Sequence, residues 1–374
     1  SRISLSNNDS GGTGGLNSTS GNTVLGYLAG QSIDDGTKNN TFIGHGVATG
    51  TTADAGWNTA VGAGALTAVT QGDDNTVLGY NAGAAITTQS EVTLLGYQAG
   101  TAINNNTANQ TVAIGKNALA ANTTGAYNTA VGYLALQTNV DGSYNTAVGY
   151  ETLEVFEADS ANHGNNTAVG YRAGRFVSTG TENTFVGVNA GMGITGTRLT
   201  GNGNTAIGDN AGVTLQGAAA NNTALGYLSG AAITTGTNNV VVGSNAGDAL
   251  TTSSSNIAVG SNALGAATSG ADNNIAIGNS ALSGSWSTAN VDNCISIGFN
   301  SMAGVLTTDA TGSIAIGQGT LNAQTSGIGN IAIGYQALNV EDDGDYNTAI
   351  GHQALKAQTG TSGSVNNTAV GYKA

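Results

Sequence analysis

The residues that could carry out chemistry are few and far apart in this sequence. The three histidines are His45, His163 and His352, and the one cysteine is Cys294. A metal site or a nucleophile with its base needs such groups within coordination or hydrogen-bond reach of one another. No two of these four residues are neighbours in sequence, so we interpret the histidines as ordinary surface residues and Cys294 as a small filler near the core.

Carboxylates are more numerous, and their densest cluster runs from Glu341 to Asp345. Carboxylates in turns can bind Ca²⁺ together with backbone oxygens, which makes Asp342, Asp343 and Asp345 weak calcium candidates. Their spacing matches neither an EF-hand loop nor the nonapeptide of calcium-binding β-rolls, so solvated turn residues are the preferred interpretation. The carboxylates also lack the arrangement of a glycosidase pair. The sequence therefore predicts no enzyme and no cofactor.

Composition excludes several classes of partner. The net charge is −14 and only 8 residues are Lys or Arg, whereas nucleic acids and anionic membranes attract clustered basic residues. No apolar run is long enough to span a bilayer, and the N-terminal residues do not resemble a signal peptide. We therefore expect no nucleic-acid binding and no membrane insertion.

One short motif recurs along the chain, and the structure that it forms must position all the remaining residues. It is first seen as Asn-Thr-Val-Leu-Gly at residues 22–26, and it occurs in 20 copies about 18 residues apart. The residue before the glycine is Val, Ile or Leu, the residue two earlier is Thr, Val or Ile, and a small residue stands between them. This alternation predicts a short strand. We expect the residue before the glycine to form the core, as in Leu25, Val61, Val131, Val148, Ile207, Ile277 and Ile333.

Two further positions of the motif, which we call slots, are each filled mainly by one residue type, Asn or Gly. Stacked Asn side chains can hydrogen-bond to the copies above and below, and they predict an amide ladder at Asn22, Asn58, Asn128, Asn145, Asn204, Asn274 and Asn347. Glycine at the end of the motif permits a positive φ or a close backbone approach. It occupies Gly26, Gly62, Gly132, Gly149, Gly208, Gly278 and Gly351, among other copies.

The repeat predicts an all-β fold. We expect a second, return strand after each glycine, followed by Thr-, Gly- and Asn-rich turns. One such coil cannot bury its own apolar slots, so copies must stack at about 4.8 Å per rung. The prediction is a parallel β-solenoid of about 20 rungs, with residues 1–20 as a lead-in segment and residues 21–374 as one continuous repeat domain with uncapped ends.

Two slots suggest ligand-binding surfaces. Tyr follows the glycine in nine copies, and the resulting stripe is a candidate glycan contact at Tyr80, Tyr97, Tyr133, Tyr150 and Tyr171, although stacked aromatics also simply stabilise a solenoid. Thr stands three before the glycine in 13 copies, which raises an ice-binding hypothesis. Val or Ile replaces this Thr elsewhere, so we expect the slot to point inward.

Both faces of the predicted strand are apolar, and this predicts association. A strand with small Ala on one side and large Val or Ile on the other needs a neighbouring chain against one side. We expect a homotrimer, side by side or intertwined, with Ala-lined contacts between chains. The same symmetry could bring three copies of one histidine together on an axis.

Two resemblances extend this interpretation. The stretches NIAVG at 256–260 and NIAIG at 274–278 and 330–334 resemble the head repeats of trimeric autotransporter adhesins, which implies a left-handed parallel β-roll with three chains around one axis. The opening SRISLSNNDSGG, with NTVLGYLAG, NTAVGYLAL and YNTAVGYETL, resembles tail-fibre proteins of marine bacteriophages. The repeat is longer here than in the adhesin heads, and we expect the extra residues to form outward loops.

The resemblances imply a structural function. We expect a virion tail-fibre shaft that takes part in host-cell attachment, with other fibre or tail subunits at its ends and a host surface glycan or protein as a further partner. The alternative is a bacterial cell-surface adhesin or extracellular filament. A polysaccharide-cleaving tail spike is a third hypothesis, and it would need clustered carboxylates on one face.

Overall fold

The computed structural model describes residues 21–34, 36–50, 54–105, 108–158, 164–266, 270–286, 291–306, 310–359 and 363–374. The predicted lead-in segment 1–20 and His163 lie outside these ranges. The chain is an all-β parallel β-solenoid. The described residues contain no helix, and therefore none that is long and apolar enough to cross a membrane.

The chain divides into two compact units, Ser1–Asn183 and Thr184–Ala374. Unit 1 contains β1 (Thr23–Leu25), β2 (Thr41–Ile43), β3 (Thr59–Val61), β4 (Thr76–Leu78), β5 (Thr93–Leu95), β6 (Val112–Ile114), β7 (Thr129–Val131), β8 (Thr146–Val148) and β9 (Thr167–Val169). Unit 2 contains β10 (Thr184–Val186), β11 (Thr205–Ile207), β12 (Thr223–Leu225), β13 (Val240–Val242), β14 (Ile257–Val259), β15 (Ile275–Ile277), β16 (Ile295–Ile297), β17 (Ile314–Ile316), β18 (Ile331–Ile333), β19 (Gly344–Asp345), β20 (Thr348–Ile350), β21 (Gly363–Ser364) and β22 (Thr368–Val370).

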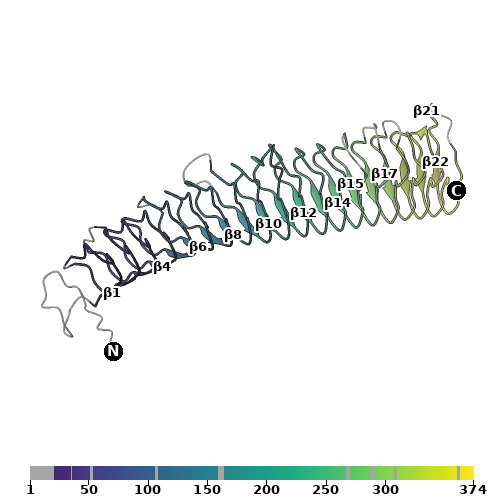
Figure 1. The fold of residues 1–374 in the computed structure, drawn as a ribbon. Helices are drawn as coiled ribbons and strands as arrows, with labels where there is room; N and C mark the ends of the chain where they lie inside the picture. Colours follow the sequence, from purple (N-terminus) through teal and green to yellow (C-terminus); the bar gives the residue numbers. More distant parts are fainter. Residues whose placement is uncertain are drawn as a thin grey trace. The chain divides into compact units, whose positions relative to one another are not determined.

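Within each unit, successive copies of the motif form parallel strands that pair in register (Figure 1). In unit 1, Thr23 pairs with Thr41 and Leu25 with Ile43. In unit 2, Ile275 pairs with Ile295 in the same way. Every slot of the motif therefore stacks on the same slot of the next coil. A side-chain type that recurs in the sequence becomes a column in the structure.

The core lies behind the middle residue of each strand. This slot is buried from β2 to β20, whether it holds a small residue such as Ala130 or a large one such as Phe42 or Val241. Apolar residues of the turns, such as Ile86 and Ala82, complete the interior.

The prediction that the residue before the glycine forms the core is therefore wrong. Leu25, Ile207 and Ile277 are 45%, 37% and 38% exposed, and Val61, Val131, Val148 and Ile333 are half-exposed. Successive strand residues point to opposite faces, so burial of the middle residue turns both of its neighbours outward. Because both faces are apolar, the alternation alone could not tell which one is the interior.

The predicted return strand is also absent from the described residues. The residues after each motif glycine form turns instead, and the backbone is left-handed at the second and fourth positions after the glycine. The fourth position is often Leu, with φ of 50° at Leu119 and 47° at Leu338, and both side chains are fully buried. Burial of the leucine side chain offsets a backbone conformation that costs non-glycine residues free energy.

The predicted amide ladder is present in both units. The carboxamide oxygen of Asn239 accepts bonds from the backbone N–H and the side-chain Nδ2 of Asn256, at 3.1 and 3.1 Å, while its own Nδ2 donates to the carbonyl of Ser253 at 2.8 Å. The seven residues predicted for the ladder are all buried; they are Asn22, Asn58, Asn128, Asn145, Asn204, Asn274 and Asn347. Each such Asn ties its own turn to the neighbouring coils.

A second ladder lies two residues earlier in the motif and was not predicted. In unit 1, Asp73 accepts the backbone N–H of Gly56 at 2.7 Å, and Ser90 accepts that of Asp73 at 2.9 Å. In unit 2, Asp345 accepts the backbone N–H of Ile328 at 2.9 Å. Many of the small polar residues in the turns are therefore hydrogen-bonded parts of the stack.

The motif glycines are required by both conformation and space. The seven named glycines have φ between 129° and 144°, namely Gly26, Gly62, Gly132, Gly149, Gly208, Gly278 and Gly351. Gly243 shows the packing: a Cβ added there would lie 2.6 Å from the carbonyl oxygen of Gly260 in the next coil. A side chain would push the coils apart.

Gly243→Ala should therefore destabilise unit 2 by about 3 kcal/mol or more, because strain and a backbone clash add. Gly196→Ala is the matched control, since a Cβ there meets nothing within 4 Å and no positive φ is involved. Urea denaturation followed by circular dichroism measures both. Equal midpoints for the two variants would contradict the packing account.

Asn256→Ala should lower stability by about 2 to 4 kcal/mol, because it leaves the buried carbonyl of Ala271 and the N–H of Asn274 without their partner. Asn279→Ala serves as the control, since Asn279 is exposed and lies outside the ladder. Amide hydrogen exchange of the coils on either side should rise in the first variant and stay unchanged in the second.

Candidate functional surface

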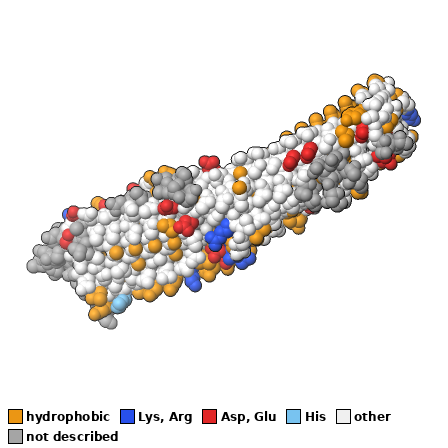
Figure 2. Space-filling view, turned by 90° about the horizontal axis from the view of Figure 1, so that it is seen from above, with side chains coloured by type: hydrophobic (Ala, Val, Ile, Leu, Met, Phe, Trp, Pro, Cys, Tyr) orange, Lys and Arg blue, Asp and Glu red, His pale blue; other side chains and the backbone are white. Residues whose placement is uncertain are grey.

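The outward faces of the strands are the candidate surface in each unit, and their residues carry no charge. Each three-residue strand from β1 to β18, together with β20 and β22, presents its first and third residues outward. All of these residues are Thr, Val, Ile or Leu. None of the protein's 22 acidic residues occupies these strand positions. Figure 2 shows hydrophobic side chains recurring in rows on the surface, with charged side chains in small separate groups.

The most apolar part of this face lies on β13 to β18 in unit 2. Both outward slots of these six strands are β-branched aliphatic residues, all exposed or half-exposed; they are Val240, Ile257, Ile275, Ile295, Ile314 and Ile331 in the first slot, and Val242, Val259, Ile277, Ile297, Ile316 and Ile333 in the third. We call these twelve residues the aliphatic face. Exposed apolar patches of soluble proteins are often interaction sites, which makes the aliphatic face a candidate.

The first slot points outward, so the expectation that its Thr residues face inward is wrong. In unit 1 eight of the nine strands carry Thr there, and Val112 is the exception. Thr59 and Thr76 are exposed, and their side chains stand side by side in register on β3 and β4. Unit 1 therefore presents a rank of hydroxyl groups where the aliphatic face of unit 2 presents methyl groups.

The tyrosines after the motif glycines form a column in unit 1 that runs from Tyr80 to Tyr171. The ring centroids of Tyr80 and Tyr97 are 5.3 Å apart, and those of Tyr133 lie 5.1 Å from Tyr150, which in turn lies 5.4 Å from Tyr171. Lys116 fills the one gap, with its Nζ 5.7 and 5.8 Å from the flanking rings.

This stacking covers the ring faces. Rings that are parallel to within 17° face one another in these pairs, although each tyrosine remains partly exposed. A sugar that stacks on an aromatic residue needs a free ring face. The column is therefore better suited to stabilising the edge of the solenoid than to serving as a glycan platform.

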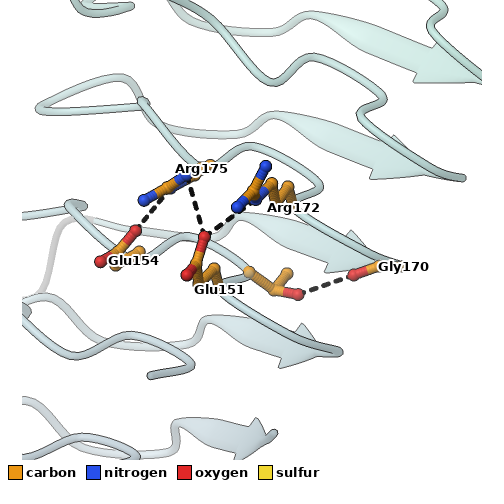
Figure 3. Close-up of polar contacts among 6 residues, drawn as sticks. Glu151, Glu154, Gly170, Arg172 and Arg175 are labelled. Atoms are coloured by element: carbon orange, nitrogen blue, oxygen red, sulfur yellow. Dashed lines mark hydrogen bonds and ion pairs between the residues drawn. The ribbon is translucent and has the colours of Figure 1, made fainter. Parts of the chain in front are cut away.

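Figure 3 shows a cluster of ion pairs in unit 1. One of its members, Arg172, lies over the ring of Tyr171 at the end of the tyrosine column. Glu151 contacts Arg172 Nε and Arg175 Nη1, both at 2.9 Å, and Glu154 contacts Arg175 Nε at 2.6 Å. Glu151 and Arg172 occupy the same slot in adjacent coils, as do Glu154 and Arg175. The network was not predicted, but opposite charges in matching slots of neighbouring copies were a visible signal.

The hydrogen-bonding interaction with Glu151 raises the pKa of Tyr150 above its ordinary value of 10.0, and partial burial contributes to the rise. Because the folded-state pKa is raised, this contact stabilises the fold at neutral pH, and the stabilisation is lost as pH rises through the folded-state value.

The acidic residues of the predicted calcium cluster separate into two groups. One oxygen each from Glu341, Asp342 and Asp343 lies within 4.8 Å of the others. Asp345 instead belongs to the second ladder through Ile328. Burial, together with the charge of Asp342, raises the pKa of Asp343. Glu341 belongs to the acidic cluster seen in the sequence but was not among its calcium candidates, and it is the fully buried member of the group.

The other reactive groups that the structure describes are two histidines and Cys294. His45 stacks on Tyr27, with centroids 5.4 Å apart, and His352 lies between Tyr335 and Tyr372 at 5.0 and 5.2 Å. Cys294 is buried in an Asn-ladder slot, and burial raises its pKa to about 11, which suits a filler and opposes a role as a nucleophile.

No protein-family model matches the chain, and no curated protein matches it.

Glu151→Gln should break both ion pairs to the arginines and lower the pKa of Tyr150 toward its ordinary value. Carbon-13 NMR of the ring carbons, recorded through an alkaline titration, measures this directly. Glu157→Gln is the control, because Glu157 is exposed on the same coil. An unchanged Tyr150 titration in Glu151→Gln would contradict the assigned cause.

Proposed function

We propose that this chain is the shaft of a homotrimeric virion fibre, in which the outward strand faces of three copies cover one another. The observation that carries the proposal is the uncharged outward face, above all the aliphatic face on β13 to β18. In an isolated chain these β-branched side chains contact water, and burying them gains free energy in proportion to the apolar area removed.

A second copy of the same chain is the occupant that best fits this face. The face repeats with every coil, and only a partner with the same repeat offers matching columns along the whole surface. Side chains without charge can meet their own copies without repulsion, whereas the acidic turns would repel. Closed rotational symmetry is the usual outcome of such self-complementary association.

The number of copies and the hand of the coil follow from the resemblance of the repeats to adhesin heads, which implies three left-handed β-rolls around one axis. In this arrangement the Val and Ile columns lie between chains and the small residues lie inside each chain. This reverses the Ala-lined contact expected from the sequence.

The proposed mechanism is mechanical. Backbone bonds between coils, the two side-chain ladders and the interchain apolar contact all resist bending, so the shaft would project a receptor-binding part from the particle. The variable turns are the regions free to touch a host surface glycan or protein, and other fibre or tail subunits would join at the ends. The alternative is a cell-surface adhesin or extracellular filament of the same trimeric architecture.

One observation favours a second candidate, ice binding by a single chain. The Thr rank of unit 1 faces outward at regular spacing, as an ice-binding face requires. The aliphatic face of unit 2 lacks these hydroxyl groups, which weighs against it. A monomeric chain that produces thermal hysteresis in an ice-growth assay would establish this second function in place of the fibre.

Ile277→Lys tests the fibre proposal. Ile277 points outward, so a single chain should keep its fold, whereas a trimer would have to bury three charges. We expect native mass spectrometry to show loss of the trimer with an unchanged circular dichroism spectrum. Thr235→Lys is the control, since Thr235 is exposed on a turn away from the strands. A trimer that survives Ile277→Lys would overturn the proposed interface.

A further inference from the structure

The turn between β18 and β19 gathers three carboxylates without a cation. Glu341, Asp342 and Asp343 follow one another in sequence, and one oxygen of each lies within 4.8 Å of the other two. Within the part of the chain that the structure describes, no Lys, Arg or His forms an ion pair with them. The local charge is therefore not neutralised by the protein.

Two oxygens in this cluster are buried and have no hydrogen-bond partner. Glu341 is fully buried; its Oε1 accepts the backbone N–H of Gly344 at 2.8 Å, and its Oε2 has no partner. Oδ1 of Asp343 is likewise buried without a partner. An uncompensated buried carboxylate is costly, and buried charges in proteins are usually paired or coordinate a metal.

The neighbouring coils show that the charge is not needed to fill this slot. Counted from the motif glycine, the residue equivalent to Glu341 is Gln324 in the preceding coil and Gln358 in the following one. Gln324 donates to the carbonyl of its own turn and to Ser313. The Oε1 of Gln324 is buried without a partner, as is the Oε2 of Glu341, so what distinguishes Glu341 is its negative charge.

We propose that Glu341, Asp342 and Asp343 form a Ca²⁺ site. Ca²⁺ takes oxygen ligands at 2.3–2.6 Å, so ligands on opposite sides of the ion lie up to about 5 Å apart, which agrees with the observed spread. Mg²⁺ demands near-ideal octahedral geometry at about 2.0–2.1 Å and usually keeps several waters, so a group of three adjacent carboxylates suits it less well. Asp342 is exposed, so the site is open to solvent and water can complete the coordination.

The ion would stabilise the turn that leads into β19 and its hydrogen bonds to the preceding coil. Glu341 holds the N–H that begins β19, and the backbone oxygen of Asp342 accepts bonds from Thr325 and Ser326 of the preceding coil, at 2.7 and 3.1 Å. Ca²⁺ bound here would fix both the turn and its contact with that coil. This inference does not depend on the fibre proposal, because the site lies within one chain.

Isothermal titration of the full chain with CaCl₂, after treatment with EDTA, tests the site. We expect one Ca²⁺ per chain, with Mg²⁺ binding more weakly, and a rise in Tm on adding CaCl₂. Hydrogen exchange of the peptide covering residues 336–350 should slow in CaCl₂, because the bonds made by Glu341 and Asp342 become fixed.

Glu341→Gln copies the residue of the two adjacent coils and should fold. It is expected to lower the Ca²⁺ affinity at least about tenfold, since the site loses its buried charge. In EDTA this variant should melt at a higher temperature than the unmodified chain. Asp345→Asn is the matched control; it removes a charge from the same turn but not from the cluster, and should change the affinity less than Glu341→Gln.

Two results would overturn the assignment. One is an unmodified chain that binds no Ca²⁺ at millimolar concentration. The other is a Glu341→Gln variant that binds Ca²⁺ as tightly as the unmodified chain, which would place binding at another group of carboxylates.

Discussion

The rest of the structure depends on the in-register stacking of coils within each unit. A parallel strand of three residues pairs with the next, and the motif glycine comes so close to the following coil that a side chain there would meet its backbone. This close approach fixes the register. A slip of one residue would turn the buried slot outward, so every column, ladder and stack depends on it.

The same stacking decides what lies inside and outside. One coil has room behind its strand for one inward side chain, so the middle slot is buried and both flanking slots face outward. The interior is therefore completed by turn residues, including leucines held in a left-handed conformation. The outward aliphatic columns are apolar surface that a single solenoid cannot bury. This exposed surface is the physical reason for proposing that chains associate.

Sequence reasoning succeeded where a slot has one chemistry. Asn239 and Gly243 each satisfy a requirement that only one or two residue types meet, and their roles followed from identity and period. It failed where two faces were alike, because Ala276 and Ile277 are both apolar and the alternation is symmetric. It failed also at the turns, because the identity of a leucine such as Leu119 does not predict a positive φ. Glu341 could have been found by comparison with the Gln residues in its slot.

If copies of this chain cover the uncharged outward face, the unmodified chain should associate in solution, and its mass there can be measured. Sedimentation equilibrium should give about three times the chain mass of 36.5 kDa, over a range of concentrations. A single-chain mass at every concentration would contradict the account, because the aliphatic face would then stay in contact with water.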